Sequence, residues 1–358
     1  MPFDAPRSLW ETVKVGRMNL SHRLAMAPMT RSRAQADGTP GDLAATYYAQ
    51  RAGLGLLISE GTQPSADGQG YSTTPGIHSD AHVAGWKKVA DAVHAKGGHL
   101  YLQLMHAGRM AHPDNTPHHR QPVAPSAISA KQPMFTPSGL SETAEPRALT
   151  TAEVKQTVKD FVAAAKRAIE AGADGVEIHG ANGYLVQQFF APNANVRTDE
   201  YGGSIENRTR FAIEVTKAVA AAIGADRTGF RISPLNTAGG LAEGPEAEDL
   251  YRHLVKELNK LDLAYLHVLH TGSEELLKDI RSLWKHPLLV NRRSAKPAEL
   301  DRDLKAGIAD VVPVGQLALA NPDLVARLKA NAPLNAAVRE TFFGGDARGY
   351  TDYPTLTA

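Results

Sequence analysis

Cysteine is absent from the 358-residue chain. Disulfides, Fe–S clusters, zinc–thiolate sites and cysteine nucleophiles are therefore excluded. Net charge is almost absent as well, because 39 Lys and Arg residues balance 38 Asp and Glu residues. A charge of +1 gives neither a nucleic acid nor an acidic membrane an electrostatic reason to bind, so neither is expected as a partner.

Long apolar runs are also missing. No stretch of the sequence reaches the roughly 18 consecutive apolar residues that a membrane-spanning helix needs. The opening residues, MPFDAPRSLW, lack the basic stretch followed by an apolar one that is typical of a signal peptide. We therefore expect a cytoplasmic protein without a membrane span.

The chain does contain a repeated alternation of short apolar runs with longer amphipathic ones. The runs that read as strands are 23–29, 54–59, 99–105, 174–179, 228–233, 264–269, 287–291 and 309–315. The helical runs between them are 41–53, 81–98, 150–172, 211–222, 246–260, 273–284 and 297–306. This repetition predicts an α/β fold, the (β/α)8 TIM barrel, whose sites lie at the carboxyl ends of the strands.

The rival architecture is a doubly wound sheet. No G-x-G-x-x-G follows the first strand, which argues against that fold. No linker divides the chain, so residues 1–358 are expected to form a single domain. Residues 108–146, after the third strand, contain seven prolines and cannot form a helix, so we predict a lid or binding loop there.

Two polar side chains occupy strands that are otherwise apolar. Gln103 lies on the opposite face of its strand from the leucines at 100, 102 and 104, and Arg231 lies opposite Phe230 and Ile232. Both should face the barrel axis. A guanidinium buried there without a partner is costly, so we expect either a carboxylate, making Arg231 structural, or an anionic ligand at the barrel mouth.

His179, Asn182 and Tyr184 follow the fourth strand, where the barrel hypothesis places catalytic groups. The first two can donate hydrogen bonds to an oxyanion, and a phenol with a pKa of about 10 stays protonated at neutral pH and can supply a proton. A lone histidine beside an apolar run is more often structural, but the trio favours an active site. The histidines at 106, 112, 118 and 119 lack the spacing of a metal site such as H-E-x-x-H, so no metal is expected.

Several segments together resemble the old yellow enzyme family. They are MAPMTRSRA (26–34), GYSTTPGIHSDAHVAGW (70–86), LQLMHAGR (102–109), HGANGYLVQQFFAPNANVRTDEYGGSIENR (179–208) and GYTDYPTL (349–356). The resemblance implies an FMN-dependent ene-reductase on a TIM barrel, reduced by NAD(P)H. Its substrate would be an activated alkene, either an α,β-unsaturated carbonyl compound or a nitroalkene.

The resemblance also implies roles for single residues. His179 and Asn182 would bind the substrate carbonyl, and Tyr184 would protonate the α-carbon. The flavin contacts of the family would fall on Pro28, Met29, Thr30, Gly61, Gln103 and Arg231.

The chain departs from the family where the FMN phosphate binds. A glycine-containing turn is expected after the seventh strand and an arginine after the eighth, but the chain has Asn291-Arg292-Arg293 and Gly315-Gln316. We favour a compensated site, in which Arg292 or Arg293 supplies the missing cation. The alternatives are a degraded site and two arginines that merely point into solvent.

Two further departures concern the substrate pocket, where Met105 and Phe343 stand in place of tryptophan and tyrosine and make it more apolar. One rival function is a barrel with weakened FMN binding that acts as a ligand-binding or biosynthetic accessory protein. Another is a non-flavin lyase or hydrolase that uses the loop histidines. A monomer or a homodimer fits the sequence equally well.

Overall fold

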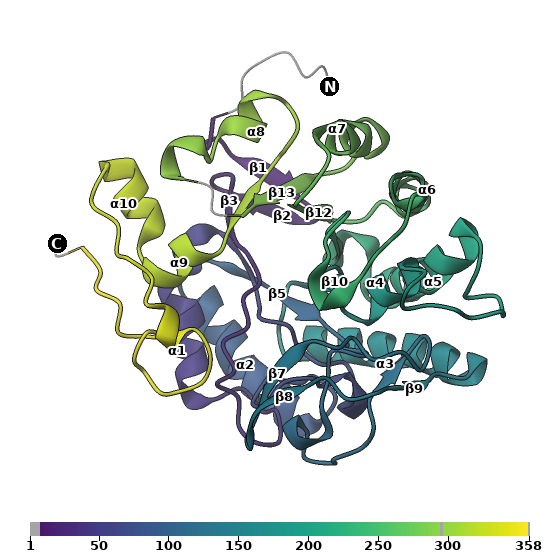
Figure 1. Cartoon of the computed structure of the whole chain (residues 1–358). Helices are drawn as coiled ribbons and strands as arrows, with labels where there is room; N and C mark the ends of the chain where they lie inside the picture. Colours follow the sequence, from purple (N-terminus) through teal and green to yellow (C-terminus); the bar gives the residue numbers. More distant parts are fainter. Residues whose placement is uncertain (1–7, 294–295, 357–358) are drawn as a thin grey trace.

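The computed structural model describes residues 8–293 and 296–356 and shows a parallel barrel ringed by helices (Figure 1). The eight strands pair in the order β13-β12-β11-β10-β5-β4-β3-β14. A parallel bridge between Leu289 and Val311 joins the two ends of the sheet. The strands are β3 (Leu24–Met26), β4 (Leu56–Ile58), β5 (His99–Leu104), β10 (Gly175–Gly180), β11 (Thr228–Ile232), β12 (Tyr265–His270), β13 (Leu288–Arg292) and β14 (Val312–Val314).

The helices follow the strands in the predicted alternation, which confirms the fold class. They are α1 (Asp42–Gln50), α2 (Asp80–His94), α3 (Thr151–Glu170), α5 (Ile205–Ile223), α6 (Ala247–Asn259), α7 (Glu274–Leu283) and α8 (Arg302–Lys305). Shorter helices α4 (Leu185–Phe190), α9 (Gln316–Ala320) and α10 (Leu324–Ala330) complete the chain. At the start of α3, Thr150 Oγ1 accepts from the Glu153 N–H while the Glu153 carboxylate accepts from the Thr150 N–H, a capping box that satisfies two backbone donors.

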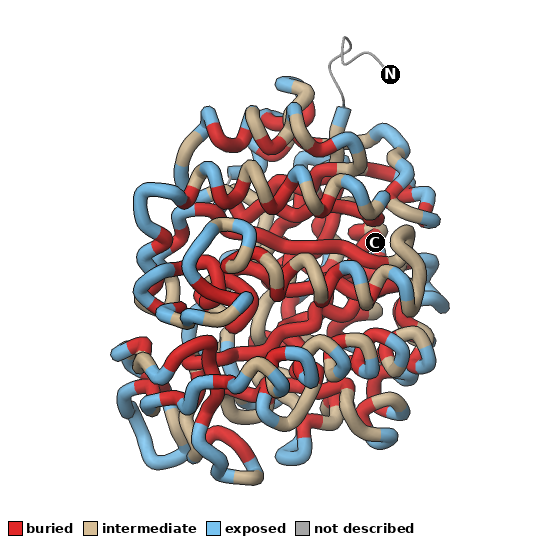
Figure 2. The backbone as a smooth tube through the Cα atoms, turned by 90° about the vertical axis from the view of Figure 1, so that its right-hand side faces the viewer, coloured by how far each residue is buried: buried red, intermediate tan, exposed pale blue. Residues whose placement is uncertain are grey.

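Each strand separates two apolar cores because successive side chains point to opposite faces. Leu100, Leu102 and Leu104 of β5 pack outward against the helices. Tyr101, on the opposite face, belongs to an inner cluster with Leu56, Ile58, Tyr265 and Leu289. In Figure 2 the strands form a continuous buried centre, while the helices alternate between buried and exposed positions. The predicted inward face of β5 is therefore confirmed.

Two features differ from the elements expected around the barrel. A hairpin of β1 (Val13–Val15) and β2 (Met18–Leu20) places Val15, Met18 and Leu20 in the inner cluster, so it covers one end of the barrel. The single helix expected at 297–306 is instead a 3-10 turn, Pro297–Glu299, followed by the short α8. Among the described residues, no helix is both long and apolar enough to cross a membrane.

Residues 108–146 are non-helical apart from one 3-10 turn, and they contain strands that the proline content did not reveal. Strand β7 (Pro133–Thr136) forms an antiparallel hairpin with β8 (Gly139–Glu142). Strand β6 (Val123–Ala124) pairs with β9 (Arg147–Ala148). The role of this segment as a lid stays a prediction.

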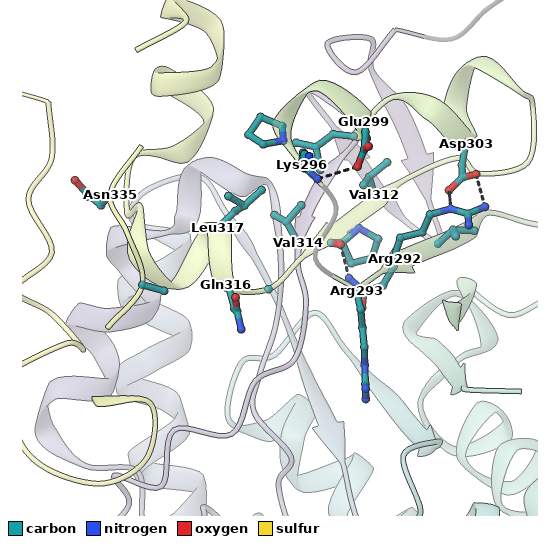
Figure 3. A pocket seen from close by; sticks show the side chains of 17 residues that line it. Arg292, Arg293, Lys296, Glu299, Asp303, Val312, Val314, Gln316, Leu317 and Asn335 are labelled. Carbon is teal, nitrogen blue, oxygen red and sulfur yellow. Dashed lines mark hydrogen bonds and ion pairs between the residues drawn. The ribbon is translucent and has the colours of Figure 1, made fainter. Parts of the chain in front are cut away.

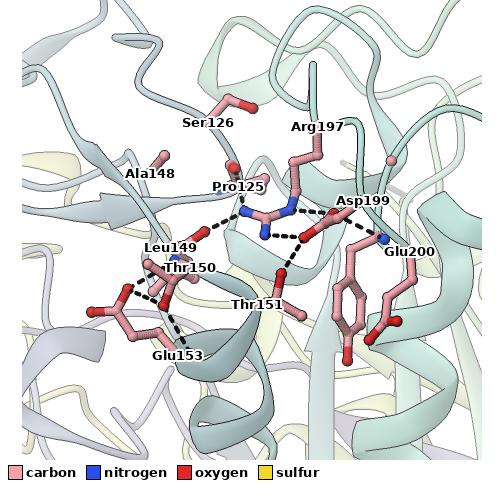
Figure 4. Close-up of polar contacts among 12 residues, drawn as sticks. Pro125, Ser126, Ala148, Leu149, Thr150, Thr151, Glu153, Arg197, Asp199 and Glu200 are labelled. Atoms are coloured by element: carbon pink, nitrogen blue, oxygen red, sulfur yellow. Dashed lines mark hydrogen bonds and ion pairs between the residues drawn. The ribbon is translucent and has the colours of Figure 1, made fainter.

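Arg197 ties this segment to the chain that follows the fourth barrel strand (Figure 4). Its guanidinium donates to the carbonyl oxygens of Pro125, at 2.9 Å, and Leu149. It also pairs with the Asp199 carboxylate at 2.5 Å, and that carboxylate accepts from the Thr151 hydroxyl at 2.6 Å. The contacts hold residues 191–204 against the end of the proline-rich segment and the start of α3.

Candidate active site

Polar side chains from β5, β10, β11 and β12 form one layer inside the barrel. The strand register sets Gln103 beside Glu177, and Arg231 beside both His179 and His267. The Glu177 carboxylate is fully buried and accepts from Gln103 Nε2 at 2.7 Å and from His267 Nδ1 at 2.8 Å. Because Nε2 of Gln103 is used in this way, its Oε1 is left as an acceptor for something outside this pair.

Arg231 lies within this layer with only 4% of its surface exposed. Its Nε is buried without a hydrogen-bond partner, and no carboxylate among the described residues forms an ion pair with it. Burial lowers the pKa of Arg231, while the charge of Glu177 raises it. The prediction that its side chain faces the axis is confirmed, and the purely salt-bridged alternative has no support in these contacts.

The turn that carries Asn182 and Gly183 begins where β10 ends. Asn182 has a φ of 56° and Gly183 a φ of 85°, both in the left-handed region that asparagine and glycine tolerate best. A Cβ at Gly183 would lie 2.4 Å from the Ala238 carbonyl oxygen. The N–H of Asn182 donates to Ser233 Oγ at 2.8 Å, and the N–H of Gly183 donates to Gln187 Oε1 at 2.8 Å. The turn is thereby held against the end of β11.

The turn that carries Asn182 brings Tyr184 beside His179. The rings of His179 and Tyr184 lie 5.0 Å apart. Burial, and secondarily the charge of Arg231, lowers the pKa of His179 well below its usual value, so the imidazole is neutral at pH 7. Burial raises the pKa of Tyr184, so its phenol keeps its proton.

Tyr71 joins this group, although the sequence reasoning did not single it out. Its hydroxyl lies 3.2 Å from that of Tyr184, within hydrogen-bond distance, and the two rings meet edge to face. Burial raises the pKa of Tyr71 well above its usual value, so both phenols are neutral. The only available signal was its place in the GYSTTPG segment, which supported the family resemblance as a whole.

The remaining expected contacts, apart from Phe343, follow the carboxyl ends of β3, β4 and β5. Pro28, Met29 and Thr30 are half-buried directly after β3. A Cβ on Gly61 would lie 2.4 Å from Met105 Sδ, so the glycine lets the buried Met105 approach the backbone. Phe343, expected in the substrate pocket, is 68% exposed.

The ends of β13 and β14 enclose a cavity of about 650 Å³, within the range of about 300–1,000 Å³ common for ligand pockets. Arg292, on its wall, donates to the Asp303 carboxylate at 2.7 and 2.9 Å and to the Glu274 carboxylate at 2.6 and 2.9 Å. These two carboxylates raise the pKa of Arg292 and occupy its donors. Asn291 is likewise engaged, since its Nδ2 donates to the Pro313 carbonyl at 2.7 Å.

Arg293 differs from its neighbour. Figure 3 shows its side chain extending away from Glu299 and Asp303, in the same direction as that of Gln316. It forms no ion pair with any other described residue, and its charge contributes to lowering the pKa of Arg231. Gly315 precedes Gln316 here, and a Cβ on it would lie 3.5 Å from Met29 Sδ. Arg293 thus lines the cavity without an ion pair to any other residue in the described ranges.

A family model described as the NADH:flavin oxidoreductase / NADH oxidase family matches residues 8–335. The chain belongs to this family. A curated relative, 12-oxophytodienoate reductase 7 of Oryza sativa subsp. japonica, is 42% identical over 97% of this chain and 94% of its own length.

Solved structures agree with the family assignment. Morphinone reductase in complex with tetrahydroNAD has a TM-score of 0.94 and 43% identity, covering 98% of both chains. The old yellow enzyme homologue from Zymomonas mobilis has a TM-score of 0.94 and 39% identity, covering 98% of this chain and 100% of its own. The predicted old yellow enzyme family is thus confirmed, and the chain is an FMN-dependent oxidoreductase that uses a nicotinamide reductant.

The residues at the barrel mouth suit this cofactor. Three buried nitrogens of the layer, Arg231 Nε, His179 Nδ1 and His267 Nε2, lack a hydrogen-bond partner in the described part of the chain. The imide edge of a flavin presents carbonyl oxygens beside an N–H, which matches a guanidinium next to the free Oε1 of Gln103. Among the described residues, no group of three His, Cys, Asp or Glu side chains could hold a metal ion.

Burial of His106 should make the stability of the fold depend on pH. Burial lowers the pKa of His106 to about 4, and its Nδ1 accepts from the Gly108 N–H, which requires the unprotonated form. An unfolded histidine titrates near 6.5, so the unfolded chain takes up protons first as the pH falls. The stability contribution is therefore complete above about pH 6.5 and is lost down to about pH 4, at up to about 1.4 kcal/mol per pH unit.

Urea unfolding across this pH range checks the prediction. His106→Asn keeps an acceptor for Gly108 and should flatten the decline by up to one proton. The exposed His119 offers a matched control, and His119→Asn should leave the decline unchanged. Equal slopes for His106→Asn and the parent protein would show that His106 does not contribute.

Proposed function

We propose that the chain is an NAD(P)H-dependent ene-reductase acting on α,β-unsaturated carbonyl compounds or nitroalkenes. The observation that carries this proposal is the placement of a neutral His179 and a protonated Tyr184 beside each other at the mouth of the barrel. Arg231 pairs with His179 in the strand register, and Gln103 pairs with Glu177, two residues before His179. Bound FMN supplies the hydride, which it obtains from the nicotinamide.

His179 and Asn182 then hold the substrate oxygen. Negative charge grows on this oxygen as hydride reaches the β-carbon, and two neutral donors can stabilise it without prior rearrangement. Loss of one such donor typically costs about 10²–10³ in rate. Because the pKa of His179 is lowered, the imidazole donates a hydrogen bond and does not protonate the oxygen outright.

Tyr184 delivers the proton from its Oη to the α-carbon. Its raised pKa makes the phenol a weak acid, which suits the protonation of a strongly basic carbanion or enolate. Tyr71 keeps the hydroxyl in place through the 3.2 Å contact and stabilises the phenolate left after proton transfer. Pro28, Met29, Thr30 and Gly61, which follow β3 and β4, would hold the flavin together with Gln103 and Arg231.

For the FMN phosphate we assign the compensating cation to Arg293. Arg292 is already bound by Glu274 and Asp303, so a phosphate would have to displace both carboxylates to use it. Arg293 has no such competitor among the described residues and projects with Gln316. Backbone N–H groups at this turn and at Gly315 would complete the set of donors.

The substrate pocket should favour small apolar alkenes. Met105 is buried against Gly61 and offers no hydrogen-bonding group. Phe343 is exposed and would reach a ligand only if the segment that carries it moved inward. Neither the fold nor the mouth distinguishes NADH from NADPH, or a monomer from a homodimer.

Replacing the proposed proton donor tests the mechanism. Tyr184→Phe should leave flavin reduction by NAD(P)H nearly unchanged and slow alkene reduction at least about tenfold, because only the second half-reaction needs a proton from the enzyme. Stopped-flow absorbance of the two half-reactions measures both rates in one variant. Equal slowing of both half-reactions is the result that contradicts the proposed role. Nitroalkenes should be less affected than enones if water can protonate their product.

Replacing the two arginines separately tests the phosphate assignment. Arg293→Gln should weaken FMN about ten- to a hundredfold and riboflavin much less, because charge-assisted bonds to the phosphate are worth about 1.5–3 kcal/mol. Arg292→Gln is the matched control. It should lower stability, by leaving Glu274 and Asp303 without their cation, and change FMN affinity little. Fluorescence titration of the apoprotein measures both ligands.

A third variant distinguishes a compensated from a degraded site. Gln316→Arg should help FMN binding little if Arg293 already neutralises the phosphate. A tenfold or greater gain from Gln316→Arg, with Arg293 dispensable, would instead favour the accessory protein with weakened FMN binding.

A further inference from the structure

The segment after β11 contacts the turn that carries Asn182 through a second asparagine. Asn236 is 7% exposed, and its Nδ2 lies 3.2 Å from Oδ1 of Asn182. The two residues are 54 positions apart in the chain. Nothing in the sequence alone connects them.

The direction of this hydrogen bond follows from a third group. The backbone N–H of Ala238 donates to Oδ1 of Asn236 at 3.0 Å. An N–H can only donate, so the atom of Asn236 that receives it must be the carbonyl oxygen. The amide of Asn236 therefore presents its NH2 group to Asn182, and the atom of Asn182 that accepts must again be the oxygen.

We propose that Asn236 is a positioning residue that turns the donor end of the Asn182 amide toward the substrate. With Oδ1 of Asn182 held by Asn236, Nδ2 is the end left for the ligand. The reverse orientation would present a carbonyl oxygen to the growing negative charge of the substrate oxygen and would repel it. This inference rests on the proposed function, in which Asn182 binds that oxygen.

The backbone around Asn236 is held firmly enough to impose the orientation. Leu235 has a φ of 62°, a conformation that costs a bulky residue free energy and persists only where its surroundings enforce it. Its N–H donates to the Glu243 carboxylate at 2.8 Å. The same carboxylate accepts from Tyr251 Oη at 2.5 Å and from Gln187 Nε2 at 2.8 Å.

The turn that carries Asn182 is tied to the same structure. Gln187 also accepts from the Gly183 N–H, and Ser233, at the end of β11, accepts from the Asn182 N–H. Both ends of the contact between Asn236 and Asn182 are thus anchored by one buried network. Little freedom remains except rotation of the Asn182 amide itself, which is the motion that Asn236 prevents.

Asn236→Asp changes residue 236 from a hydrogen-bond donor to Asn182 into an acceptor. A carboxylate at 236 can still accept from the Ala238 N–H, but it cannot donate to Asn182. The Asn182 amide should then turn its NH2 group toward residue 236 and present its oxygen to the ligand. The probe is p-hydroxybenzaldehyde, which should bind the FMN-loaded enzyme as a phenolate and give a long-wavelength charge-transfer band.

The new charge at 236 also repels a phenolate, so the variant must be measured in two backgrounds. We expect Asn236→Asp to raise the Kd of the phenolate about tenfold more when Asn182 is present than when it is already Asn182→Ala. Asn236→Asp should also raise the apparent pKa of the bound phenol more when Asn182 is present than in the Asn182→Ala background. If Asn236 only supported the fold, its replacement would change the Kd and the apparent pKa equally in both backgrounds.

Two further variants separate orientation from loop stability. Asn236→Ala removes the donor without adding charge, leaves the amide free to take both orientations, and should give a smaller loss than Asn236→Asp. Asn193→Asp is the matched control. Asn193 anchors the segment after β11 that carries Asn236, through the Gly240 carbonyl and the Ala242 N–H, and its hydrogen bonds within the described residues do not include Asn182. This variant should leave the Kd and the bound pKa unchanged, and unchanged FMN affinity in all variants confirms folding.

The outcomes distinguish this inference from the proposed function. If Asn182→Ala weakens phenolate binding but Asn236→Asp has the same effect with and without Asn182, Asn236 does not orient the amide and the proposed function stands. If the parent enzyme binds no phenolate, or Asn182→Ala has no effect, the proposed anion site is wrong, and the inference falls with it.

Discussion

A guanidinium inside the barrel is the constraint on which the rest of the site depends. Arg231 is almost fully buried, and Glu177, the carboxylate whose charge raises its pKa, is occupied by Gln103 and His267. Burying a cation without a direct ion pair is costly, so a fold keeps such an arrangement only when something else offsets the cost. An electron-rich ligand at the barrel mouth would do so, and the chain belongs to a family of flavin oxidoreductases. Burial, and secondarily the charge of Arg231, keeps His179 neutral, so the guanidinium also acts on the proposed substrate site.

The direction of the hydrogen bonds then determines which end of each side-chain amide faces a ligand. The Glu177 carboxylate can only accept, so Gln103 gives it the NH2 group and turns its oxygen away. The Ala238 N–H can only donate, so Asn236 gives it the oxygen and turns its NH2 group toward the oxygen of Asn182. In the proposed site, the side-chain amide of Gln103 presents an acceptor to the cofactor and that of Asn182 presents a donor to the substrate. Phenols complete the site, because burial holds both Tyr71 and Tyr184 in the protonated form.

Local and periodic features of this structure could be predicted from the sequence. Alternation along β5 and β11 correctly placed Gln103 and Arg231 on the axis, because strand geometry depends only on neighbouring residues. The capping box at Thr150 is equally local. The trio after β10 was recognisable because its three members lie within six positions of one another.

Contacts between distant segments could not be predicted in this way. Arg292 looked available for a phosphate, yet Glu274 and Asp303, 18 and 11 residues away, occupy it. Tyr71 and Asn236 reach the site from 113 and 54 residues away from their partners. The hairpin at β7 and β8 was hidden by its prolines, one of which begins an edge strand where a missing N–H is tolerated.

The central claim is that this barrel mouth is a flavin site despite its altered phosphate turn. The most direct measurement is the absorption spectrum of the purified protein before and after denaturation, with the released chromophore identified by chromatography. We predict a flavin spectrum in the native protein and release of about one FMN per chain. A protein that stays colourless, and gains no flavin spectrum after incubation with excess FMN and removal of the unbound fraction, would contradict it.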